Sequence, residues 1–264
     1  MRTDYETLAL EYSAERVLTV VLNRVETANA VNTRMGLDLM ELFETFLLDH
    51  QGPRCIVVTG RGDKAFCAGG DLKERRNMTD EAWQAQHVIF ERVGRALLGC
   101  PIPVIAAVNG AAYGGGCEIA AACDFIYASN NARFALTEVT LGIMPGMGGT
   151  QTLPRAVGER RATEIILTGL PFTAEEAHAW GFVNRVVEPS KLLETALATA
   201  TRIAANAPIA VRQAKQSIHR GMQMSLWDGL AFEIEAYNRT PSTEDRREGL
   251  RAFNERRKPS FIGR

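Results

Sequence analysis

The sequence predicts an α/β fold. Residues 55–59 and 104–108 are short, continuous apolar runs, typical of parallel strands that are covered on both faces. A glycine-containing loop and a stretch with helical apolar spacing follow each run, and no strand pattern appears after residue 190. These observations predict a layered α/β body followed by a helical region.

The first elements should be a hairpin and a helix. Residues 7–13 alternate apolar and polar side chains, and 17–22 is rich in β-branched residues, so the two segments predict a hairpin. The following helix presents one apolar face, and Asn32 or Thr33 can cap it. That face consists of Met35, Leu39, Leu42, Phe43 and Phe46.

The alternation of strand and helix continues through the middle of the chain. A polar, glycine-rich loop at 60–71 precedes a long helix that contains Trp83, Ile89, Val93 and Leu97. Three glycines at 114–116 then lead into an alanine-rich helix, which 125–128 follows as a strand. Residues 141–149 hold too much Gly and Pro for a regular element and predict a shaped loop.

The last third of the chain is predominantly helical. Residues 173–176 have the spacing of a capping box, and 182–187 is one more predicted strand. We therefore divide the chain near residue 195, into a core at 1–195 that carries the site and a helical region at 196–264. We expect the helical region to be an oligomerisation region, because its apolar faces have little sheet to cover them.

Composition excludes several classes of function. Thirty Lys and Arg against 31 Asp and Glu give a net charge of -1, which does not fit a nucleic-acid-binding protein. The most apolar run, 102–112, is too short and too interrupted to span a membrane. Five cysteines without C-x-x-C spacing indicate reduced thiols and no metal site. Since the N-terminal residues also match no signal or transit peptide, we expect a cytoplasmic protein.

Three segments combine glycine with an acidic residue. They are Gly69-Gly70-Asp71, Gly114-Gly115-Gly116 ahead of Glu118, and Glu138 ahead of the loop 142–149. Consecutive glycines before a helix leave backbone N–H groups uncovered, which is how an oxyanion hole is built, although a tight turn uses the same residues. Glu118 lies on an otherwise apolar helix, where a carboxylate is costly without a partner or a task.

These segments, in this order, resemble the enoyl-CoA hydratase/isomerase (crotonase) family. The resemblance rests on residues 29–32, 65–73, 103–110, 114–118 and 141–151. It implies a spiral of repeated strand-strand-helix units, with a C-terminal helical region that assembles homotrimers or dimers of trimers. It also implies an acyl-CoA thioester substrate and no separate cofactor, since coenzyme A is part of the substrate.

The resemblance assigns roles to individual residues. Gly70 and Gly115 would donate the two N–H groups of an oxyanion hole for the thioester oxygen. Glu118 would activate water and Glu138 would give a proton to carbon two, which favours a two-glutamate enoyl-CoA hydratase. The residues implied to bind substrate and CoA are Ala30, Ala68, Gly70, Asp71, Leu72, Lys73, Gly115 and Arg256, with Arg256 coming from a neighbouring subunit.

The sequence is also compatible with other functions. Within the family, the alternatives are an enoyl-CoA isomerase and a branched-chain, methylglutaconyl-type hydratase, which Asp71-Leu72-Lys73-Glu74-Arg75 resembles. Outside it, residues 60–65 approximate the G-x-G-x-x-A motif of a Rossmann oxidoreductase, and an RNA-binding scaffold is a third possibility. We expect the four histidines, His50, His87, His178 and His219, to be structural or surface residues.

Overall fold

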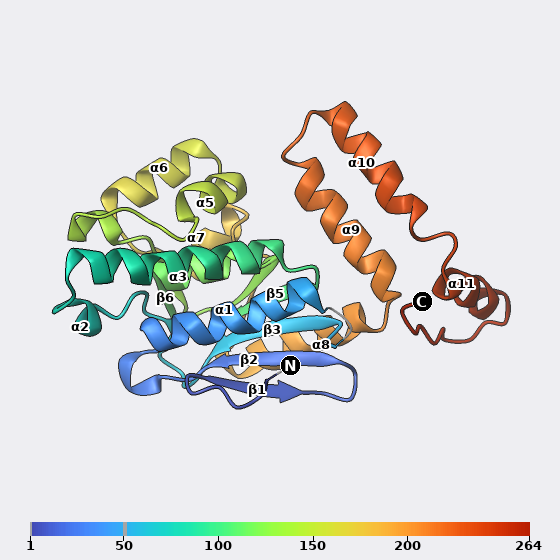
Figure 1. Cartoon of the computed structure of the whole chain (residues 1–264), viewed down its shortest axis with the longest axis horizontal. Helices are drawn as coiled ribbons and strands as arrows, with labels where there is room; N and C mark the ends of the chain where they lie inside the picture. Colours follow the sequence, from blue (N-terminus) through green and yellow to red (C-terminus); the bar gives the residue numbers. More distant parts are fainter. Residues whose placement is uncertain (1, 50–51) are drawn as a thin grey trace.

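The computed structural model describes residues 2–49 and 52–264 and contains two sheets (Figure 1). The larger sheet has the strand order β1-β2-β3-β5-β7-β10, and only β1 and β2 pair antiparallel. The smaller sheet has the order β4-β6-β8-β9. The strands of the larger sheet are β1 Leu8–Tyr12, β2 Val17–Leu22, β3 Cys55–Gly60, β5 Val104–Val108, β7 Phe125–Ser129 and β10 Arg185–Val187.

A repeated unit generates both sheets. Strands β3, β5 and β7 each add to the larger sheet, and the next strand of each unit adds to the smaller one, before the chain enters a helix. This confirms the predicted spiral of strand-strand-helix units. The strands of the smaller sheet, which sequence patterns did not predict, have two or three residues, too few to show a period. They are β4 Ala65–Cys67, β6 Ala111–Tyr113, β8 Arg133–Ala135 and β9 Phe172–Thr173.

Helices cover both faces of the larger sheet. Three of them, α1 Thr33–Leu48, α3 Asp80–Gly99 and α4 Gly115–Ala122, bury side chains in one core with alternate residues of the strands. The other face is covered by α8 Leu192–Ala204, whose Ala196 and Ala200 pack in a second core with Val57 and Ile105. The continuous apolar strands thus follow from burial on both faces.

The remaining short elements surround the smaller sheet or connect the larger ones. Two lie close to the glycine-rich segments: α2 Leu72–Arg75 and the 3-10 helix η2 Glu138–Leu141. The loop 60–65 leads into β4, not into a helix, so the Rossmann alternative is wrong. The others are η1 Val25–Thr27, α5 Gly149–Val157, α6 Glu159–Thr168, α7 Ala174–Ala179 and η3 Pro189–Lys191.

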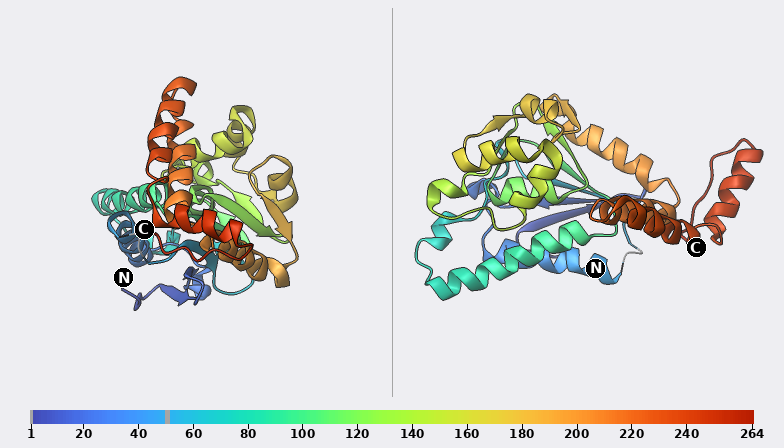
Figure 2. Two further views of the ribbon diagram at one scale, coloured as in Figure 1. Left: turned by 90° about the vertical axis from the view of Figure 1, so that its right-hand side faces the viewer. Right: turned by 90° about the horizontal axis from the view of Figure 1, so that it is seen from above.

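Three C-terminal helices form an arm that extends away from the sheets (Figures 1 and 2). They are α9 Pro208–Gly221, α10 Leu226–Asn238 and α11 Glu244–Asn254, of which α9 and α10 pack against each other. Residue 195, where the domain boundary is predicted, lies inside α8, so the division near that residue stays a prediction. Among the described helices, none is both long and apolar enough to cross a membrane.

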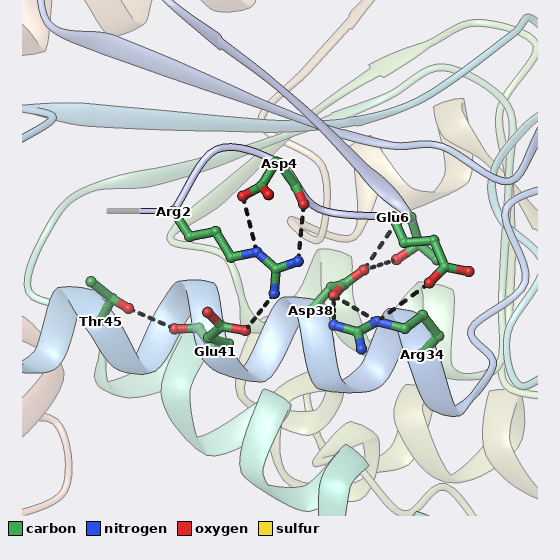
Figure 3. Close-up of polar contacts among 8 residues, drawn as sticks. Arg2, Asp4, Glu6, Arg34, Asp38, Glu41 and Thr45 are labelled. Atoms are coloured by element: carbon green, nitrogen blue, oxygen red, sulfur yellow. Dashed lines mark hydrogen bonds and ion pairs between the residues drawn. The ribbon is translucent and has the colours of Figure 1, made fainter.

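A polar network attaches the N-terminal segment to α1 (Figure 3). The buried carboxylate of Asp38 accepts hydrogen bonds from the N–H and hydroxyl of Thr7, at 3.1 and 2.7 Å, and pairs with Arg34. Arg2 bridges Asp4 and Glu41 nearby. Burial alone would raise the pKa of Asp38, but the bonds from Arg34 and Thr7 lower it below its ordinary value. Asp38 therefore stabilises the attachment of β1 as an ionised group.

Candidate active site

A pocket of about 610 Å³ opens where the glycine-rich segments meet. One wall is the face of α3 that carries Trp83, His87 and Phe90. The N-terminus of α4, η2 and the loop 141–149 form the other walls. Three segments that are distant in the sequence thus come together at one cavity.

Gly70 and Gly115 lie beside each other in the lining of this pocket. A Cβ atom on Gly115 would stand 3.9 Å from the backbone nitrogen of Gly70. Neither N–H donates a hydrogen bond to the described chain, because Gly70 precedes α2 and Gly115 is the first residue of α4. Two adjacent, unused donors at a helix N-terminus form a site for an oxyanion.

Glycine is required for this close approach. Gly69 has a φ of +93°, and a Cβ there would stand 2.7 Å from the carbonyl oxygen of Tyr113. Gly114 also has a positive φ, of +51°. L residues rarely adopt these backbone angles, so the glycines let the two loops touch.

The carboxylate of Glu118 points into the pocket from the first turn of α4, with 4% of the residue exposed. Its Oε1 accepts hydrogen bonds from the N–H groups of Met147 and Gly149, both at 2.8 Å. Burial raises the pKa of Glu118 even though these bonds oppose the change. The carboxylate is therefore held in one orientation and is more basic than an exposed glutamate.

Glu138 is the first residue of η2 and faces the same pocket. Its Oε2 is buried and has no hydrogen-bond partner in the described chain, and its Oε1 lies 3.2 Å from where a Cβ of Gly114 would stand. Burial raises the pKa of Glu138 to about 7, and the charge of Glu118 adds to this effect. A carboxyl group with this pKa can give up or take a proton near neutral pH.

The predicted CoA-binding residues fall into two groups. Ala68, Gly70, Leu72 and Gly115 line the pocket, whereas Ala30, Asp71, Lys73 and Arg256 do not. Asp71 caps α2 by accepting hydrogen bonds from the N–H groups of Lys73 and Glu74, and it pairs with Arg24 at 3.0 Å.

Lys73 and Arg256, the two basic residues of this set, lie outside the pocket. Lys73 is an exposed residue of α2, where its ammonium group can meet a phosphate. Arg256 follows α11, which lies far from α2 in this chain (Figure 1). Its predicted role as a residue supplied by a neighbouring subunit therefore stays a prediction.

Two ionisable residues of the pocket lining were not among the predicted site residues. His87, expected to be a structural or surface residue, lines the pocket, and Arg75 reaches the wall from α2. The spacing of Trp83, His87 and Phe90 on one helical face was the signal for this wall. His50 lies outside the described residues. Within 2–49 and 52–264, no three His, Cys, Asp or Glu side chains are grouped to hold a metal ion.

Known proteins are similar to this chain in sequence and in fold. A model of the enoyl-CoA hydratase/isomerase family matches residues 13–264. A short-chain-enoyl-CoA hydratase of Clostridium acetobutylicum is 44% identical, over 92% of this chain and 93% of that protein. A crotonyl-CoA hydratase of Syntrophomonas wolfei is 38% identical, over 98% of this chain and 99% of that protein. The crystal structure of an enoyl-CoA hydratase from Bacillus anthracis superposes with a TM-score of 0.95 at 42% identity, covering 98% of this chain and 100% of that one.

Proposed function

Because this chain belongs to the enoyl-CoA hydratase/isomerase family, we propose that it is an enoyl-CoA hydratase. The enzyme adds water reversibly and syn to a trans-2-enoyl-CoA and yields a 3-hydroxyacyl-CoA. The observation that carries this proposal is the pair of buried carboxylates, Glu118 and Glu138, beside two unused N–H donors in one pocket.

The two glycines stabilise the charge that develops on the substrate. When water attacks carbon three, electrons move toward the thioester oxygen and give an enolate-like state. The N–H groups of Gly70 and Gly115 hold this oxygen, and such a donor typically contributes about 10²-fold or more to turnover. Both donors belong to backbone that the packing of the loops holds in place, so they need no rearrangement during the reaction.

The two glutamates divide the proton transfers. Oε1 of Glu118 is occupied by the N–H groups of Met147 and Gly149, which leaves Oε2 to orient water and take its proton as the hydroxyl group bonds to carbon three. Glu138 holds a proton near neutral pH and gives it to carbon two. After the reaction Glu118 carries the proton taken from water and Glu138 has lost the proton given to carbon two, so proton exchange with solvent restores the starting state of the pair.

Substrate binding uses the coenzyme A part of the thioester. Ala68 and Leu72 line the pocket, with Ala30 and Asp71 supporting the same loop, and Lys73 offers a positive charge to the phosphates. Arg256 of a neighbouring subunit adds a second charge. The reaction requires no further cofactor, because water and the substrate supply every atom of the product.

The proposal includes an assembly of trimers or dimers of trimers in the cytoplasm. Support for assembly comes from large apolar side chains exposed on the arm. Support for a reducing compartment comes from the five cysteines, all free and buried. The exposed apolar residues of the arm include Ile218, Met222, Leu226, Trp227, Ile234, Tyr237, Leu250 and Phe253.

Assays with purified enzyme test the reaction. Crotonyl-CoA should lose the absorbance of its conjugated thioester, and the product should be a 3-hydroxyacyl-CoA by chromatography. A 3-enoyl-CoA tests the isomerase alternative, for which one carboxylate would suffice. Isomerisation faster than hydration would reject the hydratase function and retain the family.

A further inference from the structure

The guanidinium group of Arg75 forms part of the pocket wall and is held from three sides. It lies over the ring of Trp83, 4.3 Å from the ring centre, and over the ring of Phe90 at 5.2 Å. Its Nε donates a 2.8 Å hydrogen bond to Oε1 of Gln86. Stacking and this bond together define the plane of the guanidinium group.

The support behind Arg75 is itself rigid. Gln86 is 3% exposed, and its Nε2 donates to the hydroxyl of Thr33 and to Oε2 of Glu74, both at 2.8 Å. Oε2 of Glu74 also accepts a hydrogen bond from the N–H of Thr33. The arrangement fixes Arg75 before any ligand arrives, which lowers the entropy that binding would cost.

The outer edge of Arg75 has no hydrogen-bond acceptor among the described residues. Nη1 and Nη2 donate to no oxygen of the described chain, and Arg75 forms no ion pair with a described carboxylate. Arg75 is half-buried, and this burial lowers its pKa, although the negative charges of Glu74 and Glu138 oppose the change. An oriented, partly desolvated guanidinium edge without a hydrogen-bond acceptor is costly, and such an edge matches a carboxylate through two parallel hydrogen bonds.

Gly70 gives Arg75 the space to reach this position. A Cβ on Gly70 would stand 3.1 Å from Nη1 and 3.2 Å from Cζ of Arg75. Arg75 therefore lies directly beside the residue that would hold the thioester oxygen. Of the described residues that line the pocket, Arg75 alone carries a permanent positive charge, and Trp83, Phe90 and Met144 give the pocket an apolar character.

We propose that Arg75 binds a carboxylate at the far end of the acyl chain, so that the preferred substrate is a short 2-enoyl-CoA with a terminal carboxylate. This inference rests on the proposed hydratase function. The closeness of Arg75 to Gly70 limits the chain to about five or six carbons, because each carbon–carbon bond spans only about 1.5 Å. The thioester oxygen meets Gly70 and Gly115 while the carboxylate meets Nη1 and Nη2.

Matched substrate pairs test this proposal. Glutaconyl-CoA and trans-2-pentenoyl-CoA have five carbons, and 2,3-dehydroadipyl-CoA and trans-2-hexenoyl-CoA have six, so each pair differs by a carboxylate in place of a methyl group. The wild-type enzyme should have the higher kcat/KM for the carboxylated member of at least one pair. In Arg75→Met that preference should fall by about 10²-fold, as when a partly buried ion pair loses one partner.

The result is expressed as the ratio of kcat/KM between the two substrates of a pair. A change that affects the hydration of both substrates equally, such as an effect of Arg75 on Glu138, cancels in this ratio. Arg76→Met is the control, because it removes the same charge from an exposed neighbour that does not line the pocket. It should keep the wild-type ratio.

Three other outcomes would each overturn part of the proposal. If wild type hydrates the neutral substrates better in both pairs, the carboxylate proposal is overturned and the hydratase function stands. If Arg76→Met changes the ratio as much as Arg75→Met does, net charge explains the preference and the assignment to Arg75 is wrong. If a correctly assembled enzyme hydrates none of the four, the proposed function fails, and this inference fails with it. The wild-type comparison needs no variant, so misfolding of Arg75→Met would not protect the proposal.

Discussion

The N–H of Gly149 donates a 2.8 Å hydrogen bond to Oε1 of Glu118, which ties the first residue of α5 to the first turn of α4. The N–H of Met147 donates to the same oxygen. The loop 141–149 therefore holds the candidate base by one oxygen. Removing the charge of Glu118 need not remove these contacts, because an amide oxygen can accept the same two bonds.

Replacing either glutamate by glutamine should abolish most hydration. In Glu118→Gln and Glu138→Gln, kcat for crotonyl-CoA should fall by about 10²- to 10⁴-fold, because glutamine cannot transfer the proton. The double variant should be little slower than either single variant, since the two groups act as one unit. Thermal denaturation checks that the fold is retained, and full hydratase activity in either single variant would contradict the two-glutamate mechanism.

Hydrogen exchange at carbon two should separate the roles of the two carboxylates. If Glu138 alone serves that carbon, Glu118→Gln should still exchange the α-proton of a saturated acyl-CoA with deuterated water, whereas Glu138→Gln should not. Mass spectrometry of the recovered thioester measures the exchange. The opposite pattern would interchange the two assignments.

The pH profile of kcat/KM should be bell-shaped. Hydration needs Glu118 ionised and Glu138 protonated, and dehydration needs the reverse, so one proton on the pair is the active state in both directions. Activity should fall as the pH rises through about 7, the pKa to which burial raises Glu138. It should also fall in acid, when Glu118 is protonated. Initial rates of hydration from pH 4 to 9 measure both limbs, and constant activity above pH 7 would reject Glu138 as the acid.

Proline at position 115 should damage catalysis more than binding. Gly115 is the first residue of α4, a position that tolerates proline, but Gly115→Pro deletes the N–H that would hold the thioester oxygen. Turnover should fall by about 10²- to 10³-fold while CoA affinity changes far less. Gly115→Ala keeps the N–H and is the control for added bulk. Near-wild-type turnover in a folded Gly115→Pro enzyme would remove Gly115 from the mechanism.

The arm should depend on a buried ion pair. Nζ of Lys215, on α9, lies 2.7 Å from the carboxylate of Asp124 beside the sheet, and both side chains are nearly buried. Lys215→Met removes the ammonium partner of the nearly buried Asp124 and should reduce the free energy of unfolding by about 3 kcal/mol. Urea denaturation measures this loss, and Lys215→Met combined with Asp124→Asn should recover part of it.

The same pair gives a pH dependence of stability. Burial would raise the pKa of Asp124, but His219 and Lys215 lower it below the ordinary value. The unfolded chain therefore binds the proton more tightly, and the stabilisation that is present at neutral pH should be lost as the pH falls through the folded-state pKa. A wild-type protein that gained stability in acid relative to Lys215→Met would contradict this sign.

The exposed face of the arm should mediate assembly. Trp227 is 78% exposed and Ile234 is 60% exposed on α10, and a stable monomer rarely leaves such side chains uncovered together. Light scattering should give the mass of a trimer or hexamer for wild type, and Trp227→Glu with Ile234→Glu should lower it. Only monomer at micromolar concentration in wild type would count against both the assembly and the role of Arg256.

Much of the site could be predicted because its chemistry is local in the sequence. Glycines next to Asp71 and Glu118 identified the loops that carry donors and carboxylates, and the short apolar strands identified the layered fold. The three-residue strands of the smaller sheet could not be predicted, since their pairing partners are remote in the chain and so few residues show no period.

The sequence by itself determined the strand-loop-helix order, the family to which it belongs, and the candidate donors and carboxylates. Only the tertiary structure decided that Glu138, whose Oε2 has no partner in the described chain, and Arg75, whose outer edge has no acceptor there, line the same pocket. It also decided that Trp83, Gln86 and Phe90 hold that edge in place. Burial and desolvation come from segments that meet only after the chain folds, so the proton affinity of a carboxyl group and the partner of a guanidinium group cannot be obtained from spacing alone.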